Sequence, residues 1–208
     1  MSLSLYQLKP GFQSLLRPSV RLLARRGVTA NQVTLLACAV SVALGVALYA
    51  DQARHPAWFA LVPVWMLARM ALNAVDGMLA REHGQQSVLG AYLNELTDVL
   101  SDAALYLPFA CLGALPALGI GLLVLLSAMS EMAGLQGLTV RASRRYDGPM
   151  GKSDRAFVFG AMGLAVALWG TLPDWTAWVL HAMVALTALN IVNRVRAGIA
   201  EQQQQVSP

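Results

Sequence analysis

Six apolar stretches, each close to the length of a bilayer crossing, most constrain how this chain can fold. They cover residues 32–50, 57–80, 88–112, 115–140, 156–172 and 175–193. A helix needs about 20 apolar residues to cross the hydrocarbon core of a membrane. With 57% hydrophobic and only 12% charged residues, the composition is difficult to reconcile with a water-soluble domain. We therefore predict an all-α integral membrane protein, a single domain over residues 1–208 with a six-helix bundle at 32–193.

The segment before the first apolar stretch has a different pattern. Residues 9–26 alternate apolar side chains such as Phe12 and Leu16 with arginines, which predicts an amphipathic helix that lies on the membrane surface. Thr29 and Thr34 follow it and are residues of the kind that cap an incoming helix. At the other end, the glutamine-rich residues 201–208 are predicted to be a disordered tail.

The basic residues indicate the orientation of the bundle, because positively charged loops stay in the cytoplasm. If the N-terminus is cytoplasmic, all of the 15 Lys and Arg residues except Arg54 and Arg69 fall on the cytoplasmic side of six spans. We therefore expect both termini in the cytoplasm, in a bacterial inner membrane. The positive charge on one face favours anionic lipids or phosphorylated substrates as partners. Nothing in the pattern indicates nucleic-acid binding.

Four acidic residues stand out where the second and third apolar stretches meet, namely Asp76, Glu95, Asp98 and Asp102. Carboxylates without partners are costly in a bilayer, so they must be paired, solvated or bound to cations. In the second stretch the i, i+3, i+4, i+7 spacing places four polar or small residues on one helix face, and in the third stretch three polar residues recur every four positions. The residues are Asn73, Asp76, Gly77 and Ala80, then Asn94, Asp98 and Asp102, with Glu95 beside Asp98.

These two polar faces favour a cation site on the cytoplasmic side. Carboxylate and amide oxygens suit hard divalent cations such as Mg²⁺, which often share their coordination with substrate phosphates. Gly77 and Ala80 are small and leave room for a ligand near the helix backbone. The residues alone thus predict a cytoplasm-facing pocket for a metal-bound phosphate compound.

The same stretch resembles the signature of the CDP-alcohol phosphotransferase family, D-x2-D-G-x2-A-R-x8-G-x3-D-x3-D. Every spacing is kept, and the amphipathic N-terminal segment and six spans extend the resemblance over nearly the whole chain. Two positions depart from it, because the first and third aspartates are asparagines here. The matching residues are Asn73, Asp76, Gly77, Ala80, Arg81, Gly90, Asn94 and Asp98.

The resemblance implies an enzyme that transfers a phosphatidyl group from CDP-diacylglycerol to an alcohol and releases CMP. It implies two divalent ions, Mg²⁺ or Mn²⁺, that neutralise the phosphates, and a homodimer. By the same resemblance Asp98 is both a metal ligand and the base that deprotonates the acceptor hydroxyl, and Asp76 binds metal. The nucleotide pocket would be formed by Asp76, Gly77, Ala80, Arg81 and Gly90.

The two asparagines remove two negative charges from the metal site that the family implies. An amide oxygen still ligates Mg²⁺ but brings no charge, so Asn73 and Asn94 remain candidate ligands. Glu95 and Asp102 are further candidate metal-site residues that would restore the total charge, which favours a compensated, active enzyme. A one-metal or altered-substrate variant and a catalytically impaired relative that acts as a membrane scaffold are the alternatives. A small cation transporter lined by these acids is a further alternative, since intramembrane carboxylates often mark ion pathways.

A second group of charges surrounds the segment between the fourth and fifth spans. Its basic residues are candidates for binding a small or phosphorylated alcohol acceptor, although contact with lipid headgroups explains them equally well. Arg69 and Glu131 are isolated charges within apolar stretches and require partners, each other among them. The candidate acceptor-binding residues are Arg141, Arg144, Arg145, Lys152 and Arg155.

Overall fold

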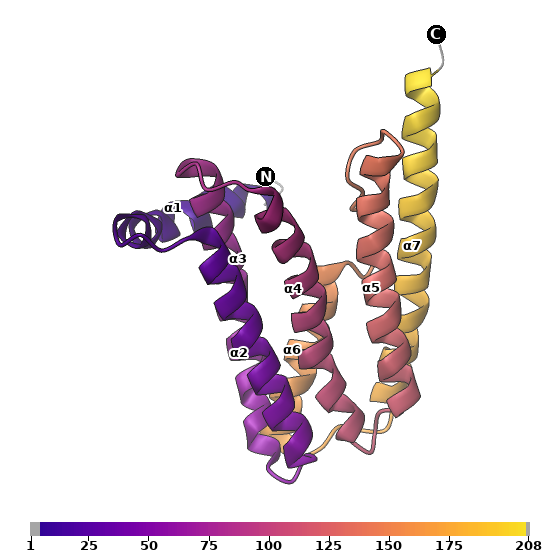
Figure 1. Ribbon diagram of the computed structural model, residues 1–208. Coiled ribbons are helices and arrows are strands. Elements are labelled where there is room, and N and C mark those ends of the chain that lie inside the picture. The colour runs from indigo at the N-terminus through magenta and orange to yellow at the C-terminus, as the bar shows by residue number, and fades with distance from the viewer. Residues whose placement is uncertain (1–4, 207–208) are drawn as a thin grey trace. The chain divides into compact units, whose positions relative to one another are not determined.

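The computed structural model describes residues 5–206 and their side chains from residue 11 to residue 205 (Figure 1). Over this range all regular structure is helical, which confirms the all-α part of the predicted fold class. The elements are α1 (Leu5–Arg25), α2 (Ala30–Asp51), η1 (Pro56–Ala60), α3 (Leu61–Glu82), α4 (Val88–Tyr106), η2 (Leu107–Cys111), α5 (Ala117–Thr139), α6 (Lys152–Trp169) and α7 (Thr176–Val206). The side chain of Lys9, counted above among the cytoplasmic charges, and residues 207–208 of the predicted tail lie outside the described residues.

Within residues 5–206, four helical segments are long and apolar enough to cross a membrane. They are Ala30–Asp51, Pro56–Glu82, Ala117–Thr139 and Thr176–Gln205. Helices α4 and α6 match the other two predicted spans in position, but each carries three charged residues within 19 and 18 residues respectively. Membrane-protein character is therefore supported, while the crossing of the bilayer by α4 and α6 remains a prediction.

The chain divides into two compact units, of which the first comprises residues 1–43 and 65–101. Its apolar core joins Val20 of α1 to Val33 of α2 and to Met78 and Leu79 of α3, all of them buried. Arg17 and Glu82 also connect α1 to the end of α3 by an ion pair with a nitrogen to oxygen distance of 3.1 Å. Helix α1 is thus held against the start of α2 and the end of α3, and its location on the membrane surface stays a prediction.

The second unit comprises residues 44–64 and 102–208, and its centre is aromatic. The Tyr106 and Phe159 rings stack with their centroids 4.0 Å apart, and Phe109 meets both Phe159 and Phe59 edge to face. These four side chains are fully buried. Offset and edge-to-face ring pairs add stability beyond the burial of their area, so this cluster fixes α6 against η1, η2 and the end of α4.

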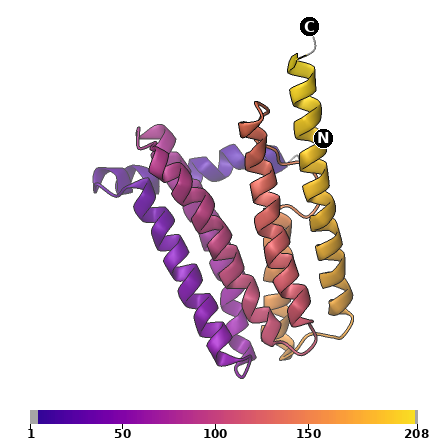
Figure 2. The same cartoon turned by 45° about the vertical axis from the view of Figure 1, so that its right-hand side comes forward.

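Helices α5 and α7 lie side by side in the second unit (Figures 1 and 2). Buried Ser130 of α5 donates a hydrogen bond of 2.7 Å to the Asn190 side chain of α7. The segment between α5 and α6 folds back onto this pair, because the Asn190 amide donates to the Pro149 carbonyl at 2.9 Å. Gly148 permits the approach: its φ is +98°, and an added Cβ would lie 2.8 Å from Cα of Asn190.

Helix α7 is longer than the sequence predicts, and the prediction of a disordered tail from residue 201 is wrong as far as Val206. Glutamine is a good helix former, and the helix also gains a tertiary contact in this region. Glu201 accepts hydrogen bonds from the Ser143 backbone at 2.9 Å and from the Ser143 hydroxyl at 2.8 Å. The end of α7 is thereby joined to the α5–α6 segment.

Candidate active site

Asp76, a signature residue of α3, is turned into the first unit. Asp76 is only 6% exposed, and its Oδ2 atom accepts a hydrogen bond of 2.7 Å from the Thr34 hydroxyl. Thr34 lies inside α2, so its interpretation as a helix cap is wrong. Thr29 does have that role, since its hydroxyl accepts a hydrogen bond from the Gln32 backbone at 3.2 Å. A polar residue inside an apolar helix was the signal that could have identified Thr34.

Asp98 of α4 is held by two donors from α3. Arg69 is 6% exposed, and one of its terminal nitrogens donates to Oδ1 of Asp98 at 2.9 Å and to the Asp98 backbone carbonyl at 3.0 Å. The Asn73 amide donates to the same Oδ1 atom at 3.2 Å. The buried charge of Arg69 therefore finds its partner in the residue that the signature marks as the base.

The signature glycines leave room for close contacts. An added Cβ on Gly77 would lie 3.0 Å from a terminal nitrogen of Arg81, so the guanidinium of Arg81 covers this glycine. An added Cβ on Gly90 would lie 2.8 Å from Oδ1 of Asn31. Ala80 packs at the edge of the apolar core formed with α1. At the two glycines, polar side chains of the protein itself lie close to the backbone.

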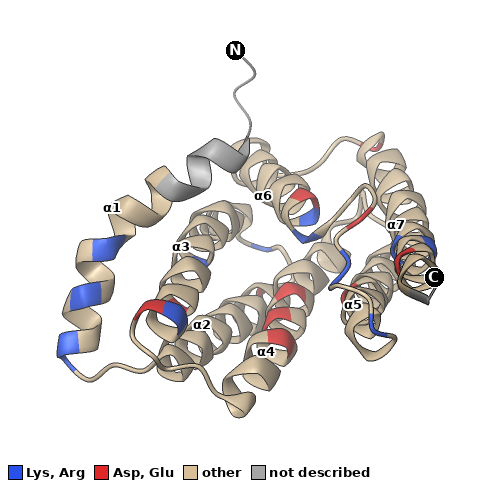
Figure 3. Ribbon diagram, turned by 90° about the horizontal axis from the view of Figure 1, so that it is seen from above, with Lys and Arg blue, Asp and Glu red and all other residues tan. Residues whose placement is uncertain are grey.

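Acidic positions recur along α4 (Figure 3). Asn94 and Glu95 are half-buried, and Asp102, one turn beyond Asp98, is 5% exposed. Within residues 5–206, no three His, Cys, Asp or Glu side chains lie together as a metal site would require. The asparagines explain much of this, because only Asp76 and Asp98 among the four signature ligand positions carry a charge.

The chemistry of these side chains fits the binding of a divalent ion. Carboxylate and amide oxygens are the donors that Mg²⁺ and Mn²⁺ prefer. A pair of ions, however, requires more negative charge than two carboxylates supply, and the guanidinium of Arg69 already engages Asp98. The residues that would hold an ion are Asp76 and Asp98, with the amide of Asn94 as a third oxygen donor.

The basic residues around the α5–α6 segment fall into two groups. Arg145 forms a two-pronged ion pair with Asp147, with distances of 2.8 and 2.9 Å, and also pairs with Glu201. The hydrogen bonds from Arg145 hold the pKa of Asp147 below its usual value. Arg145 thus has a structural role in this segment. Arg141 is exposed with a φ of +66°, and half-buried Lys152 begins α6.

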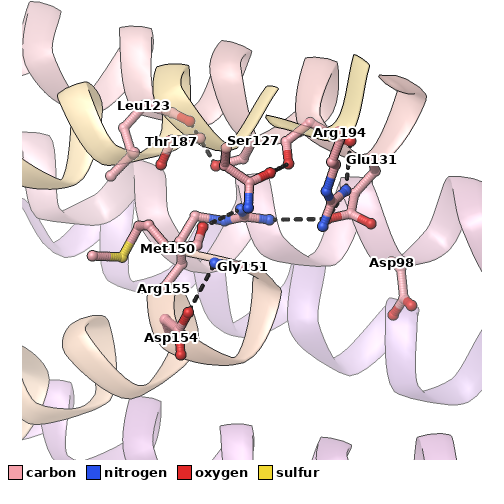
Figure 4. A network of polar contacts seen from close by, with 12 residues as sticks. Asp98, Leu123, Ser127, Glu131, Met150, Gly151, Asp154, Arg155, Thr187 and Arg194 are labelled. Carbon is pink, nitrogen blue, oxygen red and sulfur yellow. Dashed lines mark hydrogen bonds and ion pairs between the residues drawn. The ribbon is translucent and has the colours of Figure 1, made fainter. Parts of the chain in front are cut away.

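The second group converges on Glu131 of α5 (Figure 4). Its carboxylate lies 3.3 Å from a terminal nitrogen of Arg155, 3.5 Å from one of Arg194 and 3.9 Å from one of Arg144. Arg155 is fully buried and Arg194 is 3% exposed. Three guanidinium groups around one carboxylate leave a surplus of positive charge in a buried place. This is the chemistry that binds a further anion such as a phosphate.

Backbone carbonyls hold two of these arginines in place. Arg155 donates to the Met150 carbonyl at 2.9 Å, and Arg194 donates to the Ser130 carbonyl at 2.5 Å. The Nε atoms of both arginines have no hydrogen-bond partner among the described side chains and backbone. From the sequence, Arg194 is expected only as one of the cytoplasmic basic residues. Its spacing of four residues from Asn190 on an apolar helix was the signal that it belongs to a polar site.

The CDP-alcohol phosphatidyltransferase family matches residues 27–192, so the chain belongs to this family. Members of the family are phosphatidyltransferases. They use a CDP-alcohol as donor, an alcohol as acceptor, and divalent metal ions.

Two relatives extend the comparison. The chain is 46% identical to the inner membrane protein YnbA of Escherichia coli (strain K12), over 94% of this chain and 96% of the relative. It is 33% identical to the phosphatidylinositol phosphate synthase of Corynebacterium glutamicum, over 50% of this chain and 45% of that enzyme.

Proposed function

We propose that the protein is an active phosphatidyltransferase that uses CDP-diacylglycerol as donor and releases CMP. The observation that supports this proposal most strongly is the complete spacing of the signature, with Asp98 fixed in place by Arg69 and Asn73. A catalytic group must be held in position by its neighbours to be effective. A relative that had lost catalysis would have no need to keep a buried guanidinium aimed at this carboxylate.

In the proposed reaction the acceptor hydroxyl gives its proton to Asp98 and its oxygen attacks the phosphorus that carries the diacylglycerol. The new oxygen to phosphorus bond forms as the bond to the CMP oxygen breaks, and CMP leaves with its electron pair. The hydrogen bonds from Arg69 and Asn73 to Oδ1 orient the Asp98 carboxylate before the transfer. A bound Mg²⁺ or Mn²⁺ ion would supply neutralisation of the diphosphate charge.

The other signature residues have roles on the donor side in this proposal. Asp76, fixed by Thr34, would be the principal metal ligand. Gly77, Ala80 and Gly90 would admit the nucleotide close to the backbone, and Arg81 would face its phosphates. Glu95 and Asp102 would add negative potential near the ion.

We propose the arginines around Glu131 as the acceptor side. Arg144 and Arg155 from the predicted set, joined by Arg194, provide the charge that a phosphorylated alcohol would need. The name of the Corynebacterium glutamicum relative supports an acceptor of this kind. Arg141 and Lys152 remain candidates, whereas the pairing of Arg145 with Asp147 and Glu201 favours a structural role for Arg145.

The proposal includes a cytoplasmic site, cytoplasmic termini and a homodimer in a bacterial inner membrane. It is tested with purified protein in lipid nanodiscs, by measuring CMP release from CDP-diacylglycerol with Mg²⁺, with Mn²⁺ or with a chelator. The acceptors compared are glycerol 3-phosphate, inositol phosphate, inositol, serine and lipid alcohols. Metal-dependent CMP release that requires one acceptor supports the proposal. If no acceptor gives CMP release, the scaffold gains support, and cation flux without CMP release would support the transporter.

A further inference from the structure

Arg69 occupies an unusual place for a charged residue. It lies one turn before Asn73 on α3, is 6% exposed and contacts Asp98 through both the side-chain and the backbone oxygen. A buried guanidinium requires a partner that compensates its loss of hydration. Its position therefore depends on the carboxylate that the signature assigns to metal binding.

The asparagines next to this ion pair reduce the negative charge further. Asn73 directs its amide nitrogen toward Oδ1 of Asp98, so toward this carboxylate it acts as a hydrogen-bond donor. The signature positions thus contribute two carboxylates, Asp76 and Asp98, and Arg69 offsets the charge of one of them. A single divalent ion nearly balances this set. Two ions would leave a large positive surplus in a partly buried place, where charge repulsion is poorly screened.

We infer that the site holds a single divalent ion and that the guanidinium of Arg69 takes the place of a second one. This inference rests on the proposed function and revises the number of ions that the resemblance implies. In this one-ion site, the buried arginine and the asparagines at two aspartate positions belong together. Arg69 supplies the positive charge beside Asp98, and the single ion is held by Asp76 and Asp98 with the amide of Asn94.

The competing explanation is that Glu95 and Asp102 replace the missing aspartates and restore a two-ion site. Both explanations predict a metal requirement, so activity alone does not separate them. The number of bound ions does. Mn²⁺ serves as the probe, because its electron paramagnetic resonance spectrum differs between an isolated ion and two coupled ions.

The test counts Mn²⁺ ions per chain by equilibrium binding and records the spectrum of the purified full-length protein in nanodiscs. We expect one ion and the six-line spectrum of an isolated Mn²⁺ for the wild type. The triple variant Arg69→Gln, Asn73→Asp, Asn94→Asp restores four carboxylates and should bind two ions with a coupled spectrum. Arg17→Gln removes an ion-paired arginine from α1 and should still bind one ion.

Two ions in the wild type would overturn the inference, as would a single ion in a folded triple variant. If the triple variant fails to fold, Arg69→Lys and Arg69→Gln decide the question. The lysine variant keeps the charge and should bind one ion with unchanged affinity, and the glutamine variant should bind its first Mn²⁺ at least tenfold more tightly. Equal affinity in both would contradict the role of Arg69. These measurements do not depend on CMP release. They therefore test the number of bound ions independently of the proposed function.

Discussion

The Thr34 hydroxyl donates a hydrogen bond of 2.7 Å to Oδ2 of Asp76, and so a residue of α2 holds the principal metal-binding candidate of α3. A hydrogen bond to a charged group contributes about 1.5–3 kcal/mol. Thr34→Val keeps the side-chain shape and removes the donor. We expect it to raise the Mg²⁺ concentration for half-maximal CMP release by about tenfold or more.

The matched control for this change is Thr187→Val. Thr187 is a buried threonine whose hydroxyl donates to the Met183 carbonyl within α7 at 2.7 Å. It should leave the Mg²⁺ dependence unchanged. Equal shifts in the two variants would show that the loss of a buried hydroxyl, and not the support of Asp76, causes the effect.

Asp98→Asn should lower CMP release by about a hundredfold to ten-thousandfold, the usual contribution of a general base. Asparagine retains an oxygen that can accept from Arg69, so the fold should persist. Asp98→Ala removes that acceptor and leaves the Arg69 guanidinium without this partner, which should also lower the melting temperature. Activity and circular-dichroism melting curves separate the two effects. A fully active Asp98→Asn variant would show that another group is the base.

Glu131→Gln should destabilise the second unit and at the same time create a stronger anion site. The change removes the negative charge shared by Arg144, Arg155 and Arg194, and breaking a buried ion pair costs about 3–5 kcal/mol. We expect a lower melting temperature that 50 mM phosphate restores more strongly than it stabilises the wild type. The control is Glu201→Gln, which removes the carboxylate that pairs with Arg145. An absence of phosphate rescue would argue against acceptor-phosphate binding here.

Glu95→Gln and Asp102→Asn test the charge around the site. Each removes negative potential near the ion without removing a proposed ligand, so each should raise the Mg²⁺ requirement severalfold. The number of bound Mn²⁺ ions should stay at one. Combining Asn94→Asp with Glu95→Gln keeps the total charge and should recover part of the affinity, since neighbouring residues couple. An unchanged Mg²⁺ titration in both single variants would indicate that these acids act only in packing or solvation.

The topology makes a separate prediction. A reporter that is active in the cytoplasm should work when fused after Pro208, and a periplasmic reporter should work when inserted at Arg54. The basis is the positive charge of the segments assigned to the cytoplasm. The reverse pattern would place the site on the other side of the membrane and remove access to cytoplasmic CDP-linked donors.

The sequence predicted the helical fold and the shared faces of α3 and α4, because both follow from regular spacing along a helix. It did not predict that Arg69 reaches Asp98, since a long side chain can extend toward several helices and hydropathy marks it only as an anomaly. The sequence also did not predict which arginines contact Glu131 and which pair with Asp147 and Glu201. These contacts depend on how the α5–α6 segment folds back, which Gly148 permits and which Asn190, distant in sequence, stabilises.

The extension of α7 has a practical consequence for handling the protein. Glu201 is the residue through which the last turns of this helix contact Ser143 and Arg145 beside the proposed acceptor site. Trimming the glutamine-rich end as if it were dispensable would cut away this connection. A purification tag placed after residue 208 retains it, whereas a shortened chain ending before residue 201 should show a weakened affinity for the acceptor with little change in donor binding.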